Sequence, residues 1–192
     1  MYSMSARQDQ NEALCLSKGS ILPIKTYRLW QIRSGMMKTS TYLEDGAMLV
    51  LGIWGPRDLV GPVLTSVQPY RIECLTQVTA IPLSIDNHPQ LSRLLFEHVN
   101  QLEELMIIRS YRKIEIMVLK LLVWMSKRYG SSSGTGQLID LRLTHQDLAD
   151  VLGTTRVSIT RSLAQLEQQG VIERLPLGRT IVKEESFWHY DI

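Results

Sequence analysis

The sequence predicts an α+β protein with three parts in order: an N-terminal β-roll, a long helix and a C-terminal winged helix-turn-helix. Three observations predict this class. Residues 16–85 hold short apolar runs separated by Gly and Pro turns, which is typical of a roll or sandwich. Apolar residues then recur with a helical period over residues 91–129. Residues 144–168 contain two short amphipathic helices joined at a glycine.

The composition fits two small domains with modest cores. The chain has 192 residues, of which 44% are hydrophobic and 21% charged, and its net charge is +2. It has no apolar run long enough to cross a bilayer, and residues 1–11 lack the apolar stretch of a signal peptide. Cys15 and Cys74 form neither a disulfide framework nor a metal motif. We therefore expect a cytoplasmic protein with no membrane partner, cofactor or metal, whose residues 1–15 are disordered.

Turn residues set the expected strand boundaries in the roll, residues 16–85. Glu44–Gly46 is expected to be a hairpin turn, and Gly and Pro at 55–58 and 61–62 mark further turns. The expected strands are residues 29–35, 36–42, 47–54, 71–75 and 77–83.

Residues 86–130 are expected to form dimerisation helices. A helix-start signal stands at 86–89, and a break is expected at 110–113. Two heptad series lie on one coiled-coil-like seam: Leu95, Leu102, Arg109 and Ile116, with Leu91, His98, Leu105 and Arg112 between them. Packing against its own roll would explain the apolar positions of the helix equally well. The helix is too long for so small a domain to bury alone, however, so we expect a homodimer.

The first helix of the helix-turn-helix has clear boundary residues. Thr144 is a fitting N-cap, and Asp147 can reach back to the backbone N–H of the cap. Gly153 follows the helix where a tight turn needs positive φ. These residues predict a short helix over 144–152 that is followed at once by a second one.

The second helix has one apolar face and one cationic face. Ile159, Leu163 and Leu166 occupy the apolar face, while Arg156 and Arg161 stand five residues apart on the other. A guanidinium group can donate two parallel hydrogen bonds to guanine, so this helix suits the DNA major groove. An ordinary helical hairpin with solvated arginines is the alternative.

The residues around the two helices complete a winged domain at 138–192. A Gly/Ser-rich connector, expected to be flexible, precedes it at 131–137. The expected elements of the sheet and wing are a strand at 138–143, a strand at 171–175, a turn at 176–179 and a returning strand at 180–183.

The order of these parts, with their motifs, resembles the Crp/Fnr superfamily of bacterial transcription regulators over about residues 27–183. Residues 29–35 look like its strand-and-glycine motif, residues 55–61 like its later glycine turn, and residues 143–161 are the strongest match. The Arg-Val-x-x-Thr-Arg motif is closer to the nitrogen-control regulator NtcA than to the cyclic-AMP receptor, which has Glu in place of Val157. The resemblance implies a roll of the cyclic-nucleotide-binding type, truncated at its N-terminus.

The resemblance also implies a homodimer that binds double-stranded DNA at an inverted repeat like GTA-N8-TAC. Arg161 would contact guanine, Arg156 a nearby guanine or phosphate, and Val157 a thymine methyl group. Arg179 would lie on the wing, within reach of phosphate. The expected DNA-binding residues are Thr144, His145, Thr155, Arg156, Val157, Ser158, Thr160, Arg161 and Arg179. RNA polymerase would be a further partner, although no sequence signature marks the contacting surface.

The chain departs from the family at its ligand cassette. Gly61 is followed by Pro62 and Arg71 by Ile72, where the cassette has Glu after Gly and a small hydroxyl residue or Ala after Arg. No carboxylate is left for a ribose, so we expect no cyclic-nucleotide binding. Gly61, Arg71 and Arg109 could instead hold an anionic small-molecule effector. Regulation by abundance, without an effector, is the alternative.

Two other function classes compete with DNA binding. An enzyme is not expected, because His88, His98, His145 and His189 show no ligand spacing in the roll and no catalytic triad or phosphate loop appears. A winged helix that docks a protein partner gains weight from the charge of residues 140–192, which carry six Lys/Arg and eight Asp/Glu. The stretch 154–166, however, has two arginines and no acidic residue, which favours a sequence-reading DNA binder.

Overall fold

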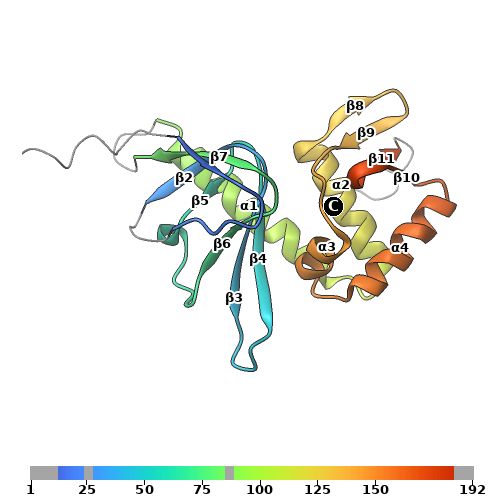
Figure 1. The fold of residues 1–192 in the computed structure, drawn as a ribbon, viewed down its shortest axis with the longest axis horizontal. Coiled ribbons are helices and arrows are strands. Elements are labelled where there is room, and N and C mark those ends of the chain that lie inside the picture. Colours follow the sequence, from blue (N-terminus) through green and yellow to red (C-terminus); the bar gives the residue numbers. More distant parts are fainter. Residues whose placement is uncertain (1–12, 24–27, 85–88, 184–192) are drawn as a thin grey trace, which may run out of the picture. The chain divides into compact units, whose positions relative to one another are not determined.

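The computed structural model describes residues 13–23, 28–84 and 89–183 (Figure 1). The chain divides into two compact units. One combines Met1–Thr41 with Ile53–His98, and the other combines Tyr42–Gly52 with Val99–Ile192. Sheets in the first part, helices in the middle and a helix-turn-helix at the end confirm the predicted α+β class. In the described residues, no helix is both long enough and apolar enough to cross a membrane.

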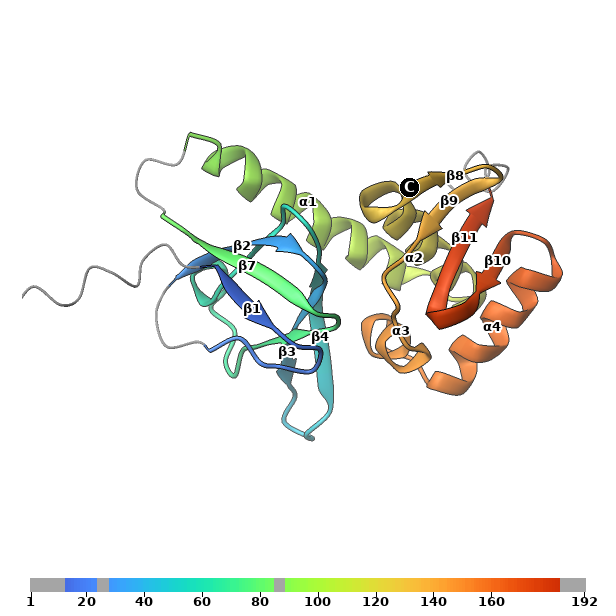
Figure 2. The same cartoon turned by 45° about the horizontal axis from the view of Figure 1, so that its top comes forward.

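Two antiparallel sheets form the N-terminal β region (Figure 2). The first has the order β1-β7-β2-β5, from Leu14–Leu16, Val78–Leu83, Leu29–Ser34 and Leu59–Val60. The second has the order β4-β3-β6, from Met48–Trp54, Met37–Tyr42 and Arg71–Cys74. A short 3-10 helix, η1, covers Pro62–Leu64. All five predicted strands are confirmed to within two residues at each end.

The expected disorder of residues 1–15 is wrong at its C-terminal end. Leu14 and Cys15 lie in β1, where Cys15 pairs with Thr79 of β7. The main-chain ladder to β7 orders this segment, and with only three residues in the strand its alternation is too short to be recognised in the sequence. Residues 1–12 lie outside the described residues.

The turn between β2 and β3 requires glycine. Gly35 has φ 82°, in the left-handed region, and a Cβ atom there would collide with the Gln77 carbonyl oxygen. The next residue, Met36, donates its backbone N–H to Thr76 Oγ1 at 2.8 Å. The strand-and-glycine motif therefore lets the backbone of one turn approach another.

Helix α1, Leu91–Ser110, completes the core of the β region with its first turns. Leu94 is buried with Leu29 and Leu59, and Leu64, Leu83 and Leu91 pack around this cluster. Further along α1, the His98 ring stacks on Trp54 with ring centroids 4.1 Å apart.

The predicted break at 110–113 is confirmed, since α1 ends at Ser110 and α2 begins at Ile114. The predicted seam, however, is wrong in part. Leu105 is only 2% exposed and the His98 ring stacks on Trp54, so these two seam residues face the chain itself. The apolar side chains left exposed on α1 are Leu95, Phe96, Val99, Met106 and Ile107. A helix that is apolar on both sides gives a heptad pattern that cannot say which half is buried internally.

After α1, the described residues of the second unit (111–183) form three α-helices and a four-stranded sheet of order β10-β11-β9-β8. The helices are α2, Ile114–Tyr129, α3, His145–Leu152, and α4, Arg156–Gln168. The strands are β8, Ser131–Ser133, β9, Gly136–Ile139, β10, Ile172–Leu175, and β11, Arg179–Lys183. The 3-10 turn η2, Pro176–Gly178, joins the last two strands.

The expected flexible connector at 131–137 is instead a hairpin. β8 pairs with β9 from Ser131 opposite Leu138 to Ser133 opposite Gly136, and β9 also pairs with β11. Main-chain hydrogen bonds stabilise this hairpin, so its polar side chains did not reveal it. The expected strand at 138–143 ends early, at Ile139, and Arg142 has a left-handed φ of 50°.

A polar network joins the second half of α1 to α2. Trp124 donates its indole N–H to Glu104 Oε2 at 2.6 Å. Arg128 donates to Gln101 Oε1 at 2.8 Å, and Gln101 donates to the Tyr129 hydroxyl at 2.7 Å. Gln101 is 2% exposed, so these bonds satisfy a buried amide and fix the angle between the two helices.

Candidate nucleic-acid interface

The start of α3 has the capping box that the sequence predicts. The Thr144 hydroxyl accepts from the Asp147 backbone N–H at 3.1 Å, and Asp147 Oδ2 accepts from the Thr144 backbone N–H at 2.8 Å. Gly153 ends the helix with φ 64°, in the left-handed region. Three residues, 153–155, therefore separate α3 from α4, and the angle between the helices is set by local hydrogen bonds.

The two helices pack through fully buried side chains. Ala149, Val151 and Ile159 each have an exposed fraction of 0%, and Leu166 has 1%. Ala149 and Ile159 therefore lie on the buried faces of α3 and α4. This packing turns the opposite face of α4 outward (Figure 1).

The outward face of α4 carries most of the predicted DNA-binding residues. Arg156, Thr160 and Arg161 are exposed, and the Val157 side chain is 59% exposed. Two more predicted residues, Thr155 and Ser158, have a structural role at the start of this helix. The Thr155 hydroxyl accepts from the Ser158 backbone N–H at 3.2 Å and lies 2.9 Å from the Ser158 hydroxyl. Two guanidinium groups and an apolar side chain thus stand together on a rigid, capped helix.

His145 at the start of α3 contacts α4 through Thr160. Its Nδ1 lies 2.8 Å from Thr160 Oγ1, and the Thr160 hydroxyl donates to the Arg156 carbonyl at 2.9 Å. Because that hydroxyl has one hydrogen, we assign the imidazole proton to Nδ1. Burial, with the nearby charges of Arg174 and Arg156, lowers the pKa of His145 below its ordinary 6.5. The ring is therefore neutral at pH 7, with Nε2 as an acceptor.

A hollow of about 610 Å³ brings some predicted residues together with others that the sequence did not single out. Thr144, His145 and Arg156 line it. Its other lining residues are Arg142, Leu143, Gln146, Leu177 and Gly178. Gln146 could have been found as the neighbour of His145 in the first helical turn. Arg142 was hidden by the expectation that the strand continues through it.

The wing follows the predicted strand, turn, strand order. Leu175 and Arg179 face each other across β10 and β11, and Leu177 at the tip has φ 65° and is 70% exposed. Arg179 is half-buried, and its Nε donates to the Pro176 carbonyl at 3.2 Å. The wing thus positions one predicted cation, Arg179, and exposes an apolar tip beside it.

The three expected effector-binding residues have other contacts. Arg71 Nη2 lies 3.4 Å from Glu73 Oε2 in the β region. Arg109 donates its Nε to the Val151 carbonyl at 2.7 Å, in the last turn of α3, and burial lowers the Arg109 pKa to about 10. Gly61 is needed because a Cβ atom would collide with the Arg28 carbonyl oxygen. Seven-residue spacing put Arg109 on the helix seam, but it could not show that this cation caps a different helix.

Within the described residues, Cys74 is not placed as a reactive thiol and the potential metal ligands are not grouped into a site. Burial and the adjacent Glu73 carboxylate raise the pKa of Cys74 to about 11, so this thiol is protonated at neutral pH. No group of three His, Cys, Asp or Glu side chains within the described ranges is placed to hold a metal ion.

Relatives in sequence share the helix-turn-helix region and more. Residues 117–186 match the model of the Crp-like helix-turn-helix domain. The chain is 38% identical over 167 residues to the regulatory protein CysR of Synechococcus elongatus, covering 84% of this chain and 79% of that protein. It is 25% identical to the global nitrogen regulator of a Synechocystis species, covering 76% and 72%. Overall identity is thus higher with CysR than with the regulator whose recognition motif the chain resembles.

Solved structures share the fold at low sequence identity. FixK2 from Bradyrhizobium japonicum superposes with a TM-score of 0.76 at 16% identity, covering 95% of this chain and 98% of that one. A Crp-family transcriptional regulator from Thermus thermophilus gives a TM-score of 0.71 at 16% identity, covering 92% and 96%. The chain therefore shares its fold with these two proteins.

Proposed function

We propose that this chain, which belongs to the Crp/Fnr superfamily of transcription regulators, is a cytoplasmic, sequence-specific DNA-binding protein that acts as a homodimer on an inverted repeat. The observation that carries the proposal is the outward face of α4. Arg156, Val157 and Arg161 project from a helix whose opposite face is fully buried and whose start is capped. Forked donors on a rigid helix can read base edges as well as contact phosphate.

The exposed side of α1 supports the homodimer. Phe96 is 71% exposed, Met106 66% and Val99 50%. Leu95 and Val99 lie four residues apart and Val99 and Met106 seven, so these exposed apolar side chains form a stripe along the helix. A second copy of α1 would cover this stripe, and a two-fold axis between the copies would present two recognition helices to half-sites roughly 34 Å apart.

The β region supports regulation without a cyclic nucleotide. Pro62 opens the 3-10 helix η1 at the position where the family's cassette has a carboxylate, and Arg71 is already next to Glu73. A ribose would find no acidic acceptor at this turn, and the family's arginine is committed to an ion pair. We therefore propose that DNA binding needs no cyclic nucleotide.

Fluorescence anisotropy with a labelled GTA-N8-TAC duplex tests the function directly. Without effector and at near-physiological salt, we expect this duplex to be preferred over a scrambled one by about a thousandfold or more. Arg161→Ala should weaken binding to the repeat by about 1–3 kcal/mol and relax the preference for the matching guanine. Arg93→Ala is the matched control, because Arg93 is an exposed arginine of α1 that pairs with Glu97. Equal and weak binding to both duplexes would favour the protein-docking alternative.

A further inference from the structure

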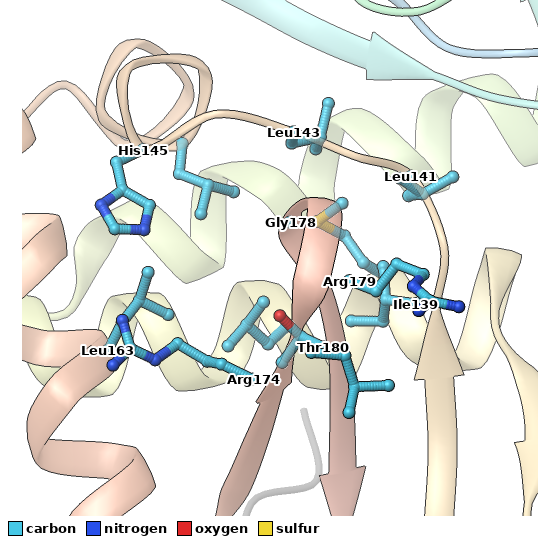
Figure 3. Close-up of a pocket in the computed structure, with 13 residues that line it drawn as sticks. Ile139, Leu141, Leu143, His145, Leu163, Arg174, Gly178, Arg179 and Thr180 are labelled. Carbon is cyan, nitrogen blue, oxygen red and sulfur yellow. The ribbon is translucent and has the colours of Figure 1, made fainter.

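A pocket of about 220 Å³ lies inside the C-terminal unit, where β10 and β11 meet the helices (Figure 3). We call it the wing pocket; residues 122, 125, 139, 141, 143, 145, 148, 163, 174, 175 and 178–180 line it. Eight of these thirteen residues are Leu, Ile or Met. Leu122, Met125 and Leu163 are each at most 3% exposed, so the floor of the pocket is apolar and shielded from water.

The polar side chains that line the wing pocket are His145, Arg174, Arg179 and Thr180, and none of them is buried, so we place the mouth of the pocket at these residues. Figure 3 shows His145 and Arg174 on one side, Arg179 on the other and the Thr180 oxygen between them. Arg174 is compensated, because its Nε donates to Glu167 Oε2 at 2.7 Å. Arg179 uses its Nε on the Pro176 carbonyl, which leaves its two terminal nitrogens with no carboxylate partner among the described residues.

Among the described residues that line the pocket, the balance of charge is therefore positive. Arg179 contributes one uncompensated cation, and Thr180 adds a hydroxyl that can donate a hydrogen bond. A cation and a hydroxyl above an apolar floor match a ligand with an anionic head and a hydrocarbon tail. A cationic ligand would be repelled, and a short anion would leave the apolar floor empty.

We propose that the wing pocket binds a medium-chain carboxylate, with its alkyl chain among the buried leucines and its head group at Arg179 and Thr180. The volume sets the chain length. A space of 220 Å³ equals about seven waters at their liquid volume. A methylene group is similar in size to a water molecule, so octanoate, with seven carbons beyond its carboxylate, is the appropriate probe.

Isothermal titration calorimetry of the full chain tests the site without DNA. Octanoate should bind with one site per chain, whereas acetate, which has the same head but no tail, should bind at least about tenfold more weakly. Octylamine, which has the same tail and the opposite charge, should also bind at least about tenfold more weakly. Octanoate that does not bind, or octylamine that binds as tightly, would overturn the proposal.

Two substitutions locate the ligand. Leu141→Trp, at the half-buried edge of the pocket, should fill the space and abolish octanoate binding. Leu49→Trp is its matched control, because it adds the same ring at an exposed strand position outside the pocket and should leave binding unchanged. Thr180→Val keeps the shape of the side chain but removes the hydroxyl, so it should weaken binding by about three- to tenfold. The methyl NMR signal of Met125 should shift on addition of octanoate, and an unmoved signal with measurable binding would place the ligand elsewhere.

A second arm of the experiment rests on the proposed function. His145 and Arg179 belong both to the wing pocket and to the expected DNA-binding set, so a bound carboxylate would neutralise a cation at the DNA surface. Saturating octanoate should then weaken binding to the GTA-N8-TAC duplex by at least about threefold, mainly through phosphate contacts. Calorimetric binding with no effect on DNA affinity would reject this coupling. Loss of DNA recognition in the Arg161→Ala variant is measured without octanoate, so the two proposals fail independently.

Discussion

The helix-turn-helix and helix α1 both have regular apolar spacing, yet that spacing specifies the burial of side chains only in the helix-turn-helix. In α4 every predicted apolar position is buried, down to an exposed fraction of 0% at Ile159, and Leu148, Val151 and Leu152 of α3 are buried as well. In α1 the predicted seam divides, with Leu105 buried and Leu95 37% exposed. The difference lies in what accompanies the apolar pattern. Thr144, Asp147 and Gly153 fix the ends of α3 through local hydrogen bonds and a left-handed φ. 

Helix α1 has apolar side chains on two sides, and its burial is decided by contacts far away in sequence. Leu94 packs with Leu29 and Leu59 of the β region, and His98 stacks on Trp54. The other side remains exposed in the single chain, with Phe96 the most exposed of its apolar residues. Capping residues close in sequence thus determine which face of α4 is exposed. In α1, contacts with residues distant in sequence determine which side chains are buried.

Replacing Ile159 with Ala tests whether the apolar face of α4 is buried in the protein core, and we expect it to have the largest effect on stability. The residue is fully buried between α3 and α4, so the substitution should destabilise the C-terminal unit by about 2–5 kcal/mol through lost burial and a residual cavity. Urea unfolding followed by tryptophan fluorescence, to which Trp124 in α2 contributes, measures the change in the free energy of unfolding. Val157→Ala on the exposed face of the same helix should change stability by no more than about 0.5 kcal/mol. Equal effects of the two substitutions would contradict the assigned helix face.

Replacing Met106 with Lys tests whether the exposed apolar stripe of α1 forms the dimer interface. Met106 is 66% exposed in the single chain, so the fold should survive, but an unpaired ammonium group would be buried in the proposed α1–α1 interface. We expect the dissociation constant of the dimer to rise at least about tenfold, which corresponds to about 1.4 kcal/mol. Sedimentation equilibrium measures this constant.

A lysine introduced outside the proposed interface shows whether the added charge alone weakens the dimer. Gln165→Lys introduces the same side chain at an exposed position of α4 and should leave the dimer constant unchanged. If Met106→Lys also leaves it unchanged, the exposed stripe of α1 is not the dimer interface.

The same difference between local and distant contacts explains which elements could be predicted from the sequence. We could predict the strands of the roll, the break at 110–113 and the winged helix because turn residues, helix caps and glycines mark their boundaries in the sequence. The β8–β9 hairpin could not, since Ser131–Ser133 is held by main-chain bonds and has no apolar pattern. Nor could the partner of Arg109, because the Val151 carbonyl is 42 residues away in sequence. At the candidate site, the exposed face of α4 was predictable, and so was Gln146 as the neighbour of His145, while Arg142 and Leu177 joined the site only through the tertiary packing of α3 and the wing.

The smallest expected effect is on the pH dependence of DNA affinity and concerns His145, which follows the N-cap of α3 and contacts Thr160 of α4. Its Nδ1 is held by Thr160, so protonation would occur at Nε2 and would create a new donor at the proposed DNA surface. In the free protein the pKa of His145 is lowered below 6.5, chiefly by burial and further by Arg174 and Arg156. Phosphate nearby would favour the charged ring, so the pKa should be higher in the DNA complex than in the free protein.

The sign of the pH dependence follows from that order of pKa values. DNA binding takes up protons whenever the complex has the higher pKa, so affinity should rise as the pH falls, by at most about tenfold per pH unit for one proton. Anisotropy titrations between pH 7.5 and 6.0 measure the slope. His145→Gln should flatten it, whereas His98→Phe, which retains an aromatic ring against Trp54 in the β region, should not. An unchanged slope in His145→Gln would mean that this ring does not face the phosphate backbone, and that the hollow beside α3 contributes shape without charge.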